Sequence, residues 1–335
     1  MYLKTSLKAK GEPLYVKGDR YYVHDKKTDK YSVATNKQGW KPLVVPLTPK
    51  QVAVFADRLN TEIPDACMKQ HAACSPKPTY MNVIRAITDN FREELYIVGG
   101  IVRDFVKTKT VSRSSDIDFM YSSKLNNIVS RLRKTFGNNI RIVYSKQYDY
   151  IMVGNNLKNS EYLEGFSIFS SKGVQAESLE SPANSLMLDI RSGTKMSLID
   201  FFDGKGIDDA KHDVWQAPVK KKDHDLWLDT LQNVLWRLLK FKLRGFTVPD
   251  ETTISVYKYW YTHQSRITEF EWNYLWKIFG ATKVDQVVQQ IVQDVDKHRK
   301  ELGFSSGQFI LMLIEKKTVV LTPHTHTNVE NDAAK

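Results

Sequence analysis

Cysteine is scarce in this chain, because Cys67 and Cys74 are the only two among 335 residues. Two thiols cannot build the disulfide framework of a small secreted protein. With His71 they would give three zinc ligands, but no fourth is evident. The sequence therefore favours two buried thiols in a helical connector over a zinc site.

Long hydrophobic runs are also missing. No segment approaches the roughly 20 apolar residues of a membrane-spanning helix, and the first residues lack the apolar core of a signal peptide. We therefore expect a cytoplasmic protein that has no membrane partner.

Negative charge is in deficit. The chain has 49 Lys and Arg against 38 Asp and Glu, a formal net charge of +11, and its pI is about 9.3. Such a positive field favours association with phosphate backbones and makes it sensitive to salt, without any sequence preference. Composition thus agrees with an RNA partner. The length is enough for two or three domains with ordinary hydrophobic cores.

The most informative segment is residues 98–119. An apolar, β-prone stretch at residues 96–98 runs into Gly99 and Gly100, and the apolar residues that follow recur at helical spacing. This pattern predicts a strand, a glycine turn and a helix. The backbone of such a turn approaches a ligand closely, and the helix N-terminus favours a polyphosphate. Arg103 would bind a phosphate oxygen or hold the turn through a carboxylate.

Two acids follow on a predicted strand. Asp116 and Asp118 alternate with Ile117 and Phe119, so both carboxylates should face one side while the apolar side chains anchor the other. Residues at i and i+2 of a strand lie about 6.6 Å apart, close enough to bind divalent ions of a two-metal site for phosphoryl transfer. Hard oxygen ligands favour Mg²⁺ or Mn²⁺.

These residues resemble the head domain of the polymerase β-like nucleotidyltransferases, in the class II branch that holds bacterial poly(A) polymerases and CCA-adding tRNA nucleotidyltransferases. The first motif of that family has the form GG, then VRD, then DxD. The resemblance implies that Asp116 and Asp118 bind the catalytic metals and that Gly99, Gly100 and Arg103 contact a nucleoside triphosphate. It also implies that an RNA 3′ hydroxyl attacks the α-phosphate.

Two later segments resemble the family less closely. Residues 179–186 are similar to its RRDFTINAL motif, with Asn184 in place and Glu180 in the position of the aspartate. We predict that both contact the nucleotide, and that Glu180 or Asp189 is a third acid or a ribose contact. Asp149, Glu161 and Glu164 are further candidates for this acid. Asp200 and Asp203, in the stretch resembling LIDPFGG, should set the turn before Gly204.

The base-reading motif of the family, EDxxRxxRxxRF, is only partly present. A helix is expected over residues 223–241, but Thr230, Leu231 and Val234 stand near the acid pair and the first arginine. These residues cannot read a base edge, so base choice is relaxed or set elsewhere. Three polar residues are the substitutes that we predict from their i, i+4, i+8 spacing: Asp229, Asn233 and Arg237. The alternative is a solvated stripe opposite the helix core.

The expected fold class is an α/β (α+β) nucleotidyltransferase palm with a mixed sheet, preceded by a small β-rich module and followed by an all-helical region. The predicted parts are a basic β-rich module (1–48), a helical connector (49–94), the palm or head (95–212), a helical nucleotide- and RNA-binding region (213–320) and a disordered tail (321–335).

The sequence thus predicts a template-independent enzyme that adds nucleotides from an NTP, ATP above all, to the 3′ end of a tRNA or another RNA. The cofactor would be Mg²⁺ or Mn²⁺. Two alternatives stay open: a nucleotidyltransferase that modifies a protein or a small molecule, and a non-catalytic RNA-binding protein that keeps the fold.

Overall fold

The computed structural model describes the chain in separate stretches. They are residues 14–17, 20–25, 30–34, 43–63, 66–67, 74–90, 95–112, 117–121, 127–145, 150–154, 166–170, 180–190, 195–218, 227–228, 233–264 and 283–320. The chain divides into two compact units, the first made of Met1–Gln232 with Gly245–Thr252 and the second of Asn233–Arg244 with Thr253–Lys335. Each unit is described by itself.

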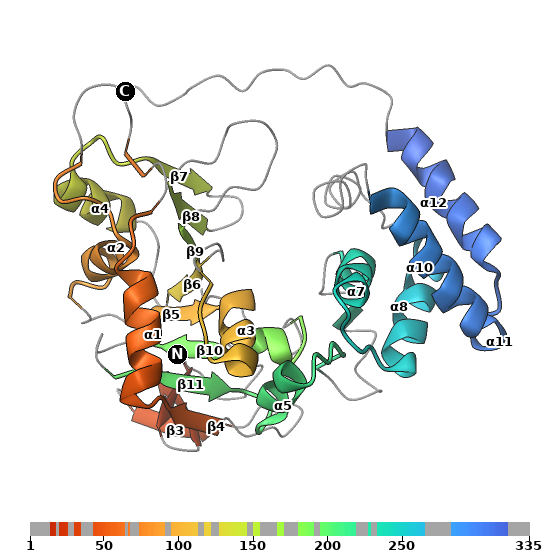
Figure 1. Cartoon of the computed structure of the whole chain (residues 1–335), viewed down its shortest axis with the longest axis horizontal. Helices are drawn as coiled ribbons and strands as arrows, with labels where there is room; N and C mark the ends of the chain where they lie inside the picture. Colours follow the sequence, from red (N-terminus) through yellow and green to blue (C-terminus); the bar gives the residue numbers. More distant parts are fainter. Residues whose placement is uncertain are drawn as a thin grey trace. The chain divides into compact units, whose positions relative to one another are not determined.

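An eight-stranded sheet forms the first unit, in the order β4-β11-β10-β5-β6-β9-β8-β7. Figure 1 shows these strands stacked from β7 at the top to β4 at the bottom. Strands β6 and β9 are parallel and the other neighbours are antiparallel, so the sheet is mixed, as expected. The strands are β4 (Leu43–Pro46), β5 (Leu95–Val98), β6 (Ile117–Tyr121), β7 (Ile142–Ser145), β8 (Tyr150–Val153), β9 (Phe166–Ser170), β10 (Met187–Asp189) and β11 (Ser197–Asp200).

Five α-helices and a short 3-10 helix, η3, accompany the sheet among the described residues. Local sequence determines where helix α1 begins. Pro49 fits the first helical position, and Thr48 and Gln51 form a reciprocal capping box. Phe55 of α1 then packs edge-on against Phe105, with ring centroids 4.6 Å apart. The helices are α1 (Pro49–Leu59), α2 (Tyr80–Ile87), α3 (Gly100–Thr108), α4 (Ile128–Phe136), η3 (Ala183–Ser185) and α5 (Lys205–Lys211).

The two faces of the sheet differ. Side chains alternate between the faces along each strand, and residues paired across strands point to the same face. Leu95, Ile97, Ile117 and Phe119 share one face and belong to the main hydrophobic core with the helices. Asp118 therefore lies on the opposite face, together with the residue paired to it on β5.

The N-terminal β-rich module is a three-stranded antiparallel meander in its described part, with the strand order β1-β2-β3. Its strands are β1 (Leu14–Lys17), β2 (Arg20–Asp25) and β3 (Lys30–Ala34). Strand β4 pairs with β11 and thus belongs to the larger sheet, although it precedes the boundary expected at residue 48. The domain boundaries otherwise stay predictions.

The prediction of two free thiols is wrong. Cys67 and Cys74 form a disulfide, because the fold brings their Cα atoms to 5.9 Å, a separation that the bond normally spans. The connector is also not helical throughout: isolated bridges pair Glu62 with Thr79 and Cys67 with Ile140. His71, the third residue of the alternative zinc site, lies outside the described residues.

The second unit is helical, as expected. Lys242, Tyr257 and Gln290 all contact the buried carboxylate of Asp294, which joins three of its helices through polar contacts. The helices are α7 (Val234–Leu243), α8 (Asp250–Thr262, whose first residues belong to the first unit), α10 (Val284–Lys297), α11 (Arg299–Leu302) and α12 (Ser306–Val320). The predicted tail at 321–335 lies outside the described residues.

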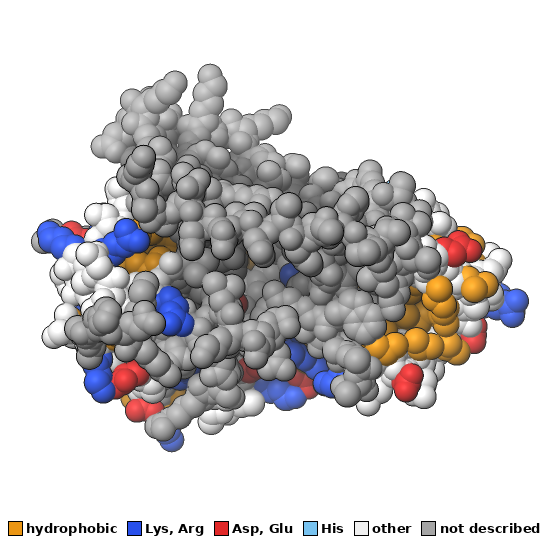
Figure 2. Space-filling view, turned by 90° about the horizontal axis from the view of Figure 1, so that it is seen from above, with side chains coloured by type: hydrophobic (Ala, Val, Ile, Leu, Met, Phe, Trp, Pro, Cys, Tyr) orange, Lys and Arg blue, Asp and Glu red, His pale blue; other side chains and the backbone are white. Residues whose placement is uncertain are grey.

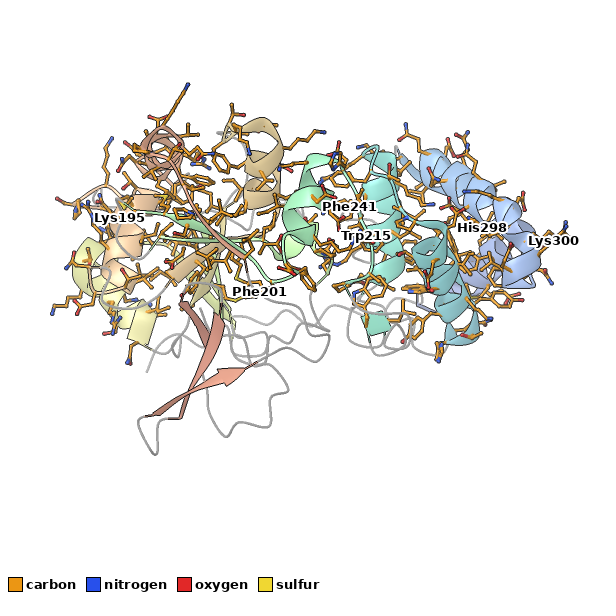
Figure 3. All side chains as sticks on the ribbon, turned by 90° about the horizontal axis from the view of Figure 1, so that it is seen from below. Lys195, Phe201, Trp215, Phe241, His298 and Lys300 are labelled. Carbon is orange, nitrogen blue, oxygen red and sulfur yellow. A yellow bond between two sulfur atoms is a disulfide. The ribbon has the colours of Figure 1, made fainter. Side chains whose placement is uncertain are left out.

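The surface of the second unit carries apolar and charged side chains. Leu311 and Ile314 of α12 are 59% and 53% exposed. Figure 2 shows hydrophobic side chains at the right-hand end of the view. Lys300 of α11 points away from the helices in Figure 3. Within the described stretches, every helix is too short or too polar to cross a membrane.

Candidate active site

The site begins at the turn between β5 and α3. Gly99 has φ +81° and ψ −155°, a conformation open essentially to glycine alone, and α3 starts at the next residue. The backbone oxygen of Gly99 accepts hydrogen bonds from the N–H groups of Val102 and Arg103. The predicted strand, glycine turn and helix are therefore confirmed. The first-turn N–H groups of such a helix favour an anion.

Asp118 lies directly beside this turn. Strand β6 pairs with β5 so that Asp118 is opposite Val98, the residue before the turn. Ile117 and Phe119 are fully buried in the core on the other face, as the alternation predicted, while Asp118 is only half-buried. A Cβ atom on Gly99 would lie 3.2 Å from Oδ2 of Asp118. Glycine at this position thus lets the carboxylate approach the backbone.

The guanidinium of Arg103 lies beside the second glycine of the turn, Gly100. Arg103 is buried, with 6% of its surface exposed. Nε donates to Oδ1 of Asp104 (2.8 Å), the terminal nitrogen Nη2 lies 2.7 Å from the same oxygen, and Nη1 donates to Oδ1 of Asn184 (2.6 Å). Nη2 also lies 3.4 Å from where a Cβ on Gly100 would be. Of the two roles predicted for Arg103, these contacts favour holding the turn.

The aromatic ring of Phe246 completes the surroundings of Arg103. The guanidinium carbon lies 5.3 Å from the ring centroid, within the range of a cation–π contact. Sequence reasoning missed this partner, because Phe246 is 143 positions from Arg103 in the sequence. The two glycines of the turn thus face opposite charges, Gly99 the carboxylate of Asp118 and Gly100 the guanidinium of Arg103.

The second motif supplies one contact of this site. Asn184 lies on η3 and binds Arg103, so the structure brings these two predicted residues together. Glu180 is half-buried at the start of the same segment. Asp189 is on β10 opposite Tyr96, and Asp118 is on β6 opposite Val98. With strands about 4.8 Å apart, their Cα atoms are about 12 Å apart, which sets Asp189 away from the carboxylate of Asp118.

Asp200 organises the turn before Gly204, as the sequence predicted. Its carboxylate is fully buried and accepts hydrogen bonds from the N–H groups of Phe202 and Ile207, both at 2.8 Å. Burial raises the pKa of Asp200 to about 6 even though these N–H groups favour the ionised form. Asp203 and Gly204 follow with φ +55° and +87°. Helix α5 starts there and packs against η3.

The turn lies beside a carboxylate, which is a hard oxygen ligand for a divalent ion. Asp118 provides a carboxylate next to a backbone that glycine keeps open, which suits Mg²⁺ or Mn²⁺. Within the described part of the chain, no group of three His, Cys, Asp or Glu side chains could hold a metal. The fit to a metal thus depends on Asp116, two residues before Asp118. Four predicted acids lie outside the described residues: Asp116, Asp149, Glu161 and Glu164.

The predicted base-reading residues belong to the helical part of the chain. The helix expected over 223–241 is interrupted, because α7 begins at Val234 and Asn233 has φ +62° as its N-terminal cap. Asn233 and Arg237 are therefore not successive positions on one continuous helix face. Asn233 is also buried, which argues against a solvated stripe, and its Oδ1 accepts no hydrogen bond from the described residues. Asp229 lies outside the described residues.

Neither a family model nor a curated protein sequence matches the chain. Solved structures of CCA-adding enzymes are similar to it. The complex of a CCA-adding enzyme with ATP is 14% identical over 74% of this chain and 53% of that protein, with a TM-score of 0.44. The Thermotoga maritima CCA-adding enzyme complexed with tRNA_CCA is 16% identical over the same shares, with a TM-score of 0.44. The chain spans about half the length of these proteins.

Proposed function

We propose that this chain is a nucleotidyltransferase that transfers a nucleotide from an NTP to an RNA 3′ end. The observation that carries the proposal is the position of Asp118 beside Gly99, at the start of α3. Few chemistries need a carboxylate and a polyphosphate-binding turn side by side. The resemblance of the GG, VRD and DxD residues to the class II nucleotidyltransferases supports the same reaction.

The roles of the residues follow from this arrangement. Gly99 and Gly100 let the triphosphate approach the backbone. The N–H groups of Gly100 and Ile101, which precede the two that donate to Gly99, bind the oxygens of the triphosphate. The RNA 3′ hydroxyl loses its proton to solvent and its oxygen forms a bond to the α-phosphorus. The bond between the α-phosphorus and the oxygen that bridges it to the β-phosphorus breaks, and pyrophosphate leaves with that oxygen. Asp116 and Asp118 would hold Mg²⁺ or Mn²⁺, which when bound offsets the charge on the phosphate oxygens. Arg103 acts from behind the turn.

The positive net charge of +11 agrees with an RNA acceptor. ATP is the nucleotide that we propose, with base choice relaxed or set by Asp229, Asn233 and Arg237. Glu180 is proposed as a further nucleotide contact. Asn184 is proposed to act on the nucleotide indirectly, by accepting the hydrogen bond of Arg103.

The test is a transfer assay on the full-length protein. A tRNA without its CCA end and an unstructured RNA are each incubated with one NTP at a time, with Mg²⁺ or Mn²⁺, and the products are sequenced. Long A tails on the unstructured RNA would indicate a poly(A) polymerase, and an ordered C-C-A on the tRNA a CCA-adding activity. No extension of any RNA would contradict the proposal.

The variant that tests the metal assignment combines Asp116→Ala with Asp118→Ala. We expect it to abolish transfer and to leave RNA binding, measured as salt-dependent affinity, largely in place. A comparison variant, Asp208→Ala, removes an exposed acid of α5 and should transfer normally. Activity that survives in the double variant would refute the metal assignment. Transfer to a protein or a small molecule, without salt-sensitive RNA binding, would favour a nucleotidyltransferase that modifies such an acceptor in place of RNA.

A further inference from the structure

We propose that Phe246 is a positioning residue for the triphosphate-binding turn and that it acts through Arg103. The inference rests on the proposed function and extends it to a segment far along the chain, Gly245–Thr252. This segment would determine how well the turn at Gly99 and Gly100 holds a triphosphate.

The segment is anchored in the first unit although the chain enters it from α7 and leaves it along α8. Thr247 donates its N–H to the oxygen of Asp213 (2.8 Å) and accepts from the N–H of Trp215 (3.0 Å), so the two stretches pair over a short parallel bridge. Trp215, labelled in Figure 3, is fully buried. The N–H of Ala217 donates to the hydroxyl of Thr252 at 3.4 Å. The backbone of Thr247, the residue after Phe246, is therefore fixed by these hydrogen bonds, which restricts where the ring of Phe246 can lie.

The contacts of Arg103 constrain its guanidinium within its plane and at one face. The hydrogen bonds to Asp104 and Asn184 lie near the plane of the group, because N–H donors point outward in that plane. The ring of Phe246 lies at cation–π distance, 5.3 Å from the guanidinium carbon. An aromatic ring attracts the cation with its negative face, which an aliphatic side chain lacks.

The guanidinium lies against the turn itself. Its Nη2 atom is 3.4 Å from the point that a Cβ on Gly100 would occupy. A shift of the guanidinium therefore changes both the packing and the positive potential behind the backbone that would bind phosphate oxygens. In this arrangement the ring of Phe246 keeps the charge of Arg103 behind the turn, where a polyanion benefits from it without direct contact.

Phe246→Leu and Phe246→Tyr form the test pair in the full-length protein. Leucine keeps apolar volume but removes the aromatic face, whereas tyrosine keeps that face. Binding of Mg²⁺–ATP and of inorganic tripolyphosphate is measured by calorimetry, and KM for ATP and kcat are measured in the transfer assay. We expect Phe246→Leu to bind both phosphates about threefold to thirtyfold more weakly and to raise KM more than it lowers kcat. Phe246→Tyr should restore binding to the wild-type range.

Phe136→Leu is the control for general loss of stability. Phe136 is a buried residue of α4 in the core of the first unit, and α4 packs against α2. This variant should lower the free energy of unfolding and leave the affinity for tripolyphosphate unchanged. RNA affinity should be unchanged in all the variants.

The outcomes separate the two proposals. Wild-type protein that binds ATP together with a Phe246→Leu variant that binds it equally well would overturn the role of Phe246 and leave the proposed function standing. An equal loss of affinity in Phe246→Leu and Phe246→Tyr would also overturn it, because the aromatic face would then not matter. Wild-type protein that binds neither phosphate would refute the proposed function, and the inference resting on it.

Discussion

The Oδ2 atom of Asp118 lies 3.2 Å from the point that a Cβ atom on Gly99 would occupy. This distance links two features that are 19 residues apart in the printed sequence, the carboxylate of β6 and the turn that begins α3. The pairing of Val98 with Asp118 sets it, since residues opposite each other on neighbouring strands share a face.

The first prediction concerns Gly99→Ala. The added methyl group enters a backbone conformation that costs about 1–3 kcal/mol for a residue other than glycine, and it crowds Asp118. We expect the free energy of unfolding to fall by about that amount and binding of Mg²⁺–ATP to be lost. Urea denaturation and calorimetric titration measure the two effects.

Gly137→Ala is the matched control. Gly137 has φ +78° and ψ 178°, close to the values of Gly99, but a Cβ there would meet no atom of the described residues within 4 Å. It should therefore destabilise the protein to a similar extent without affecting nucleotide binding. Equal nucleotide affinity in both variants would mean that the contact between Gly99 and Asp118 has no functional part.

The second prediction concerns Gly206→Ala in α5. A Cβ there would lie 2.5 Å from the backbone oxygen of Pro182 and 3.0 Å from Oδ1 of Asp200, so α5 and η3 would have to separate. Overpacking of this kind costs about 1–3 kcal/mol. Among the described residues, a Cβ at Gly307 of α12 would meet only the hydroxyl of Ser305, at 3.9 Å, so Gly307→Ala should be neutral or slightly stabilising. Equal midpoints of urea denaturation for the two variants would contradict this packing.

The third prediction concerns the pH dependence of stability. The pKa of Asp200 is about 6 in the folded protein because the carboxyl is buried, against about 3.9 in an unfolded chain. Between these values the folded state binds more protons, so the free energy of unfolding should fall as the pH rises from about 4 to about 6, and then level off. The contribution of this group is about 3 kcal/mol over that range.

Asp200→Asn removes this titration. Its free energy of unfolding, measured by urea denaturation from pH 4 to 7, should therefore decline less steeply with pH than that of the wild type. Asp296→Asn, which replaces an exposed acid of α10, should keep the wild-type slope. Parallel curves for the wild type and Asp200→Asn would rule out the raised pKa.

The fourth prediction concerns the polar centre of the second unit. Asp294 accepts from Nζ of Lys242 at 2.5 Å and from the hydroxyl of Tyr257 at 3.1 Å, and all three residues are mostly buried. Asp294→Ala should cost about 3–5 kcal/mol because it leaves a buried ammonium group without its counter-ion. Tyr257→Phe, which removes only a hydroxyl, should cost about 1 kcal/mol. Thermal unfolding that does not distinguish the two variants would show that the ion pair contributes little.

Local patterns were sufficient for much of the candidate site. The strand ending at Val98, the turn at Gly99 and the helix after it follow from side-chain periodicity and from the conformational freedom of glycine. The burial of Ile117 and Phe119 opposite Asp118 follows from the alternation of a strand. These features depend on neighbours within a few residues, so the sequence alone predicts them.

Other features depend on contacts between distant segments. The predicted helix over 223–241 failed because Asn233 takes a left-handed conformation and α7 begins only at the next residue. The disulfide between Cys67 and Cys74 follows from the path of the connector and from its bridge to Ile140. Spacing along the chain predicts neither, because the packing of other elements sets both backbone paths.

The sequence by itself thus determined the glycine turn, the acidic strand after it and the positive charge of the chain. Only the tertiary structure decided that Asn184, 81 positions from Arg103, accepts its hydrogen bond and that Phe246 lies at cation–π distance from the same guanidinium. The physical reason is that strand pairing and helix packing position such residues, and these depend on the whole sheet and its core.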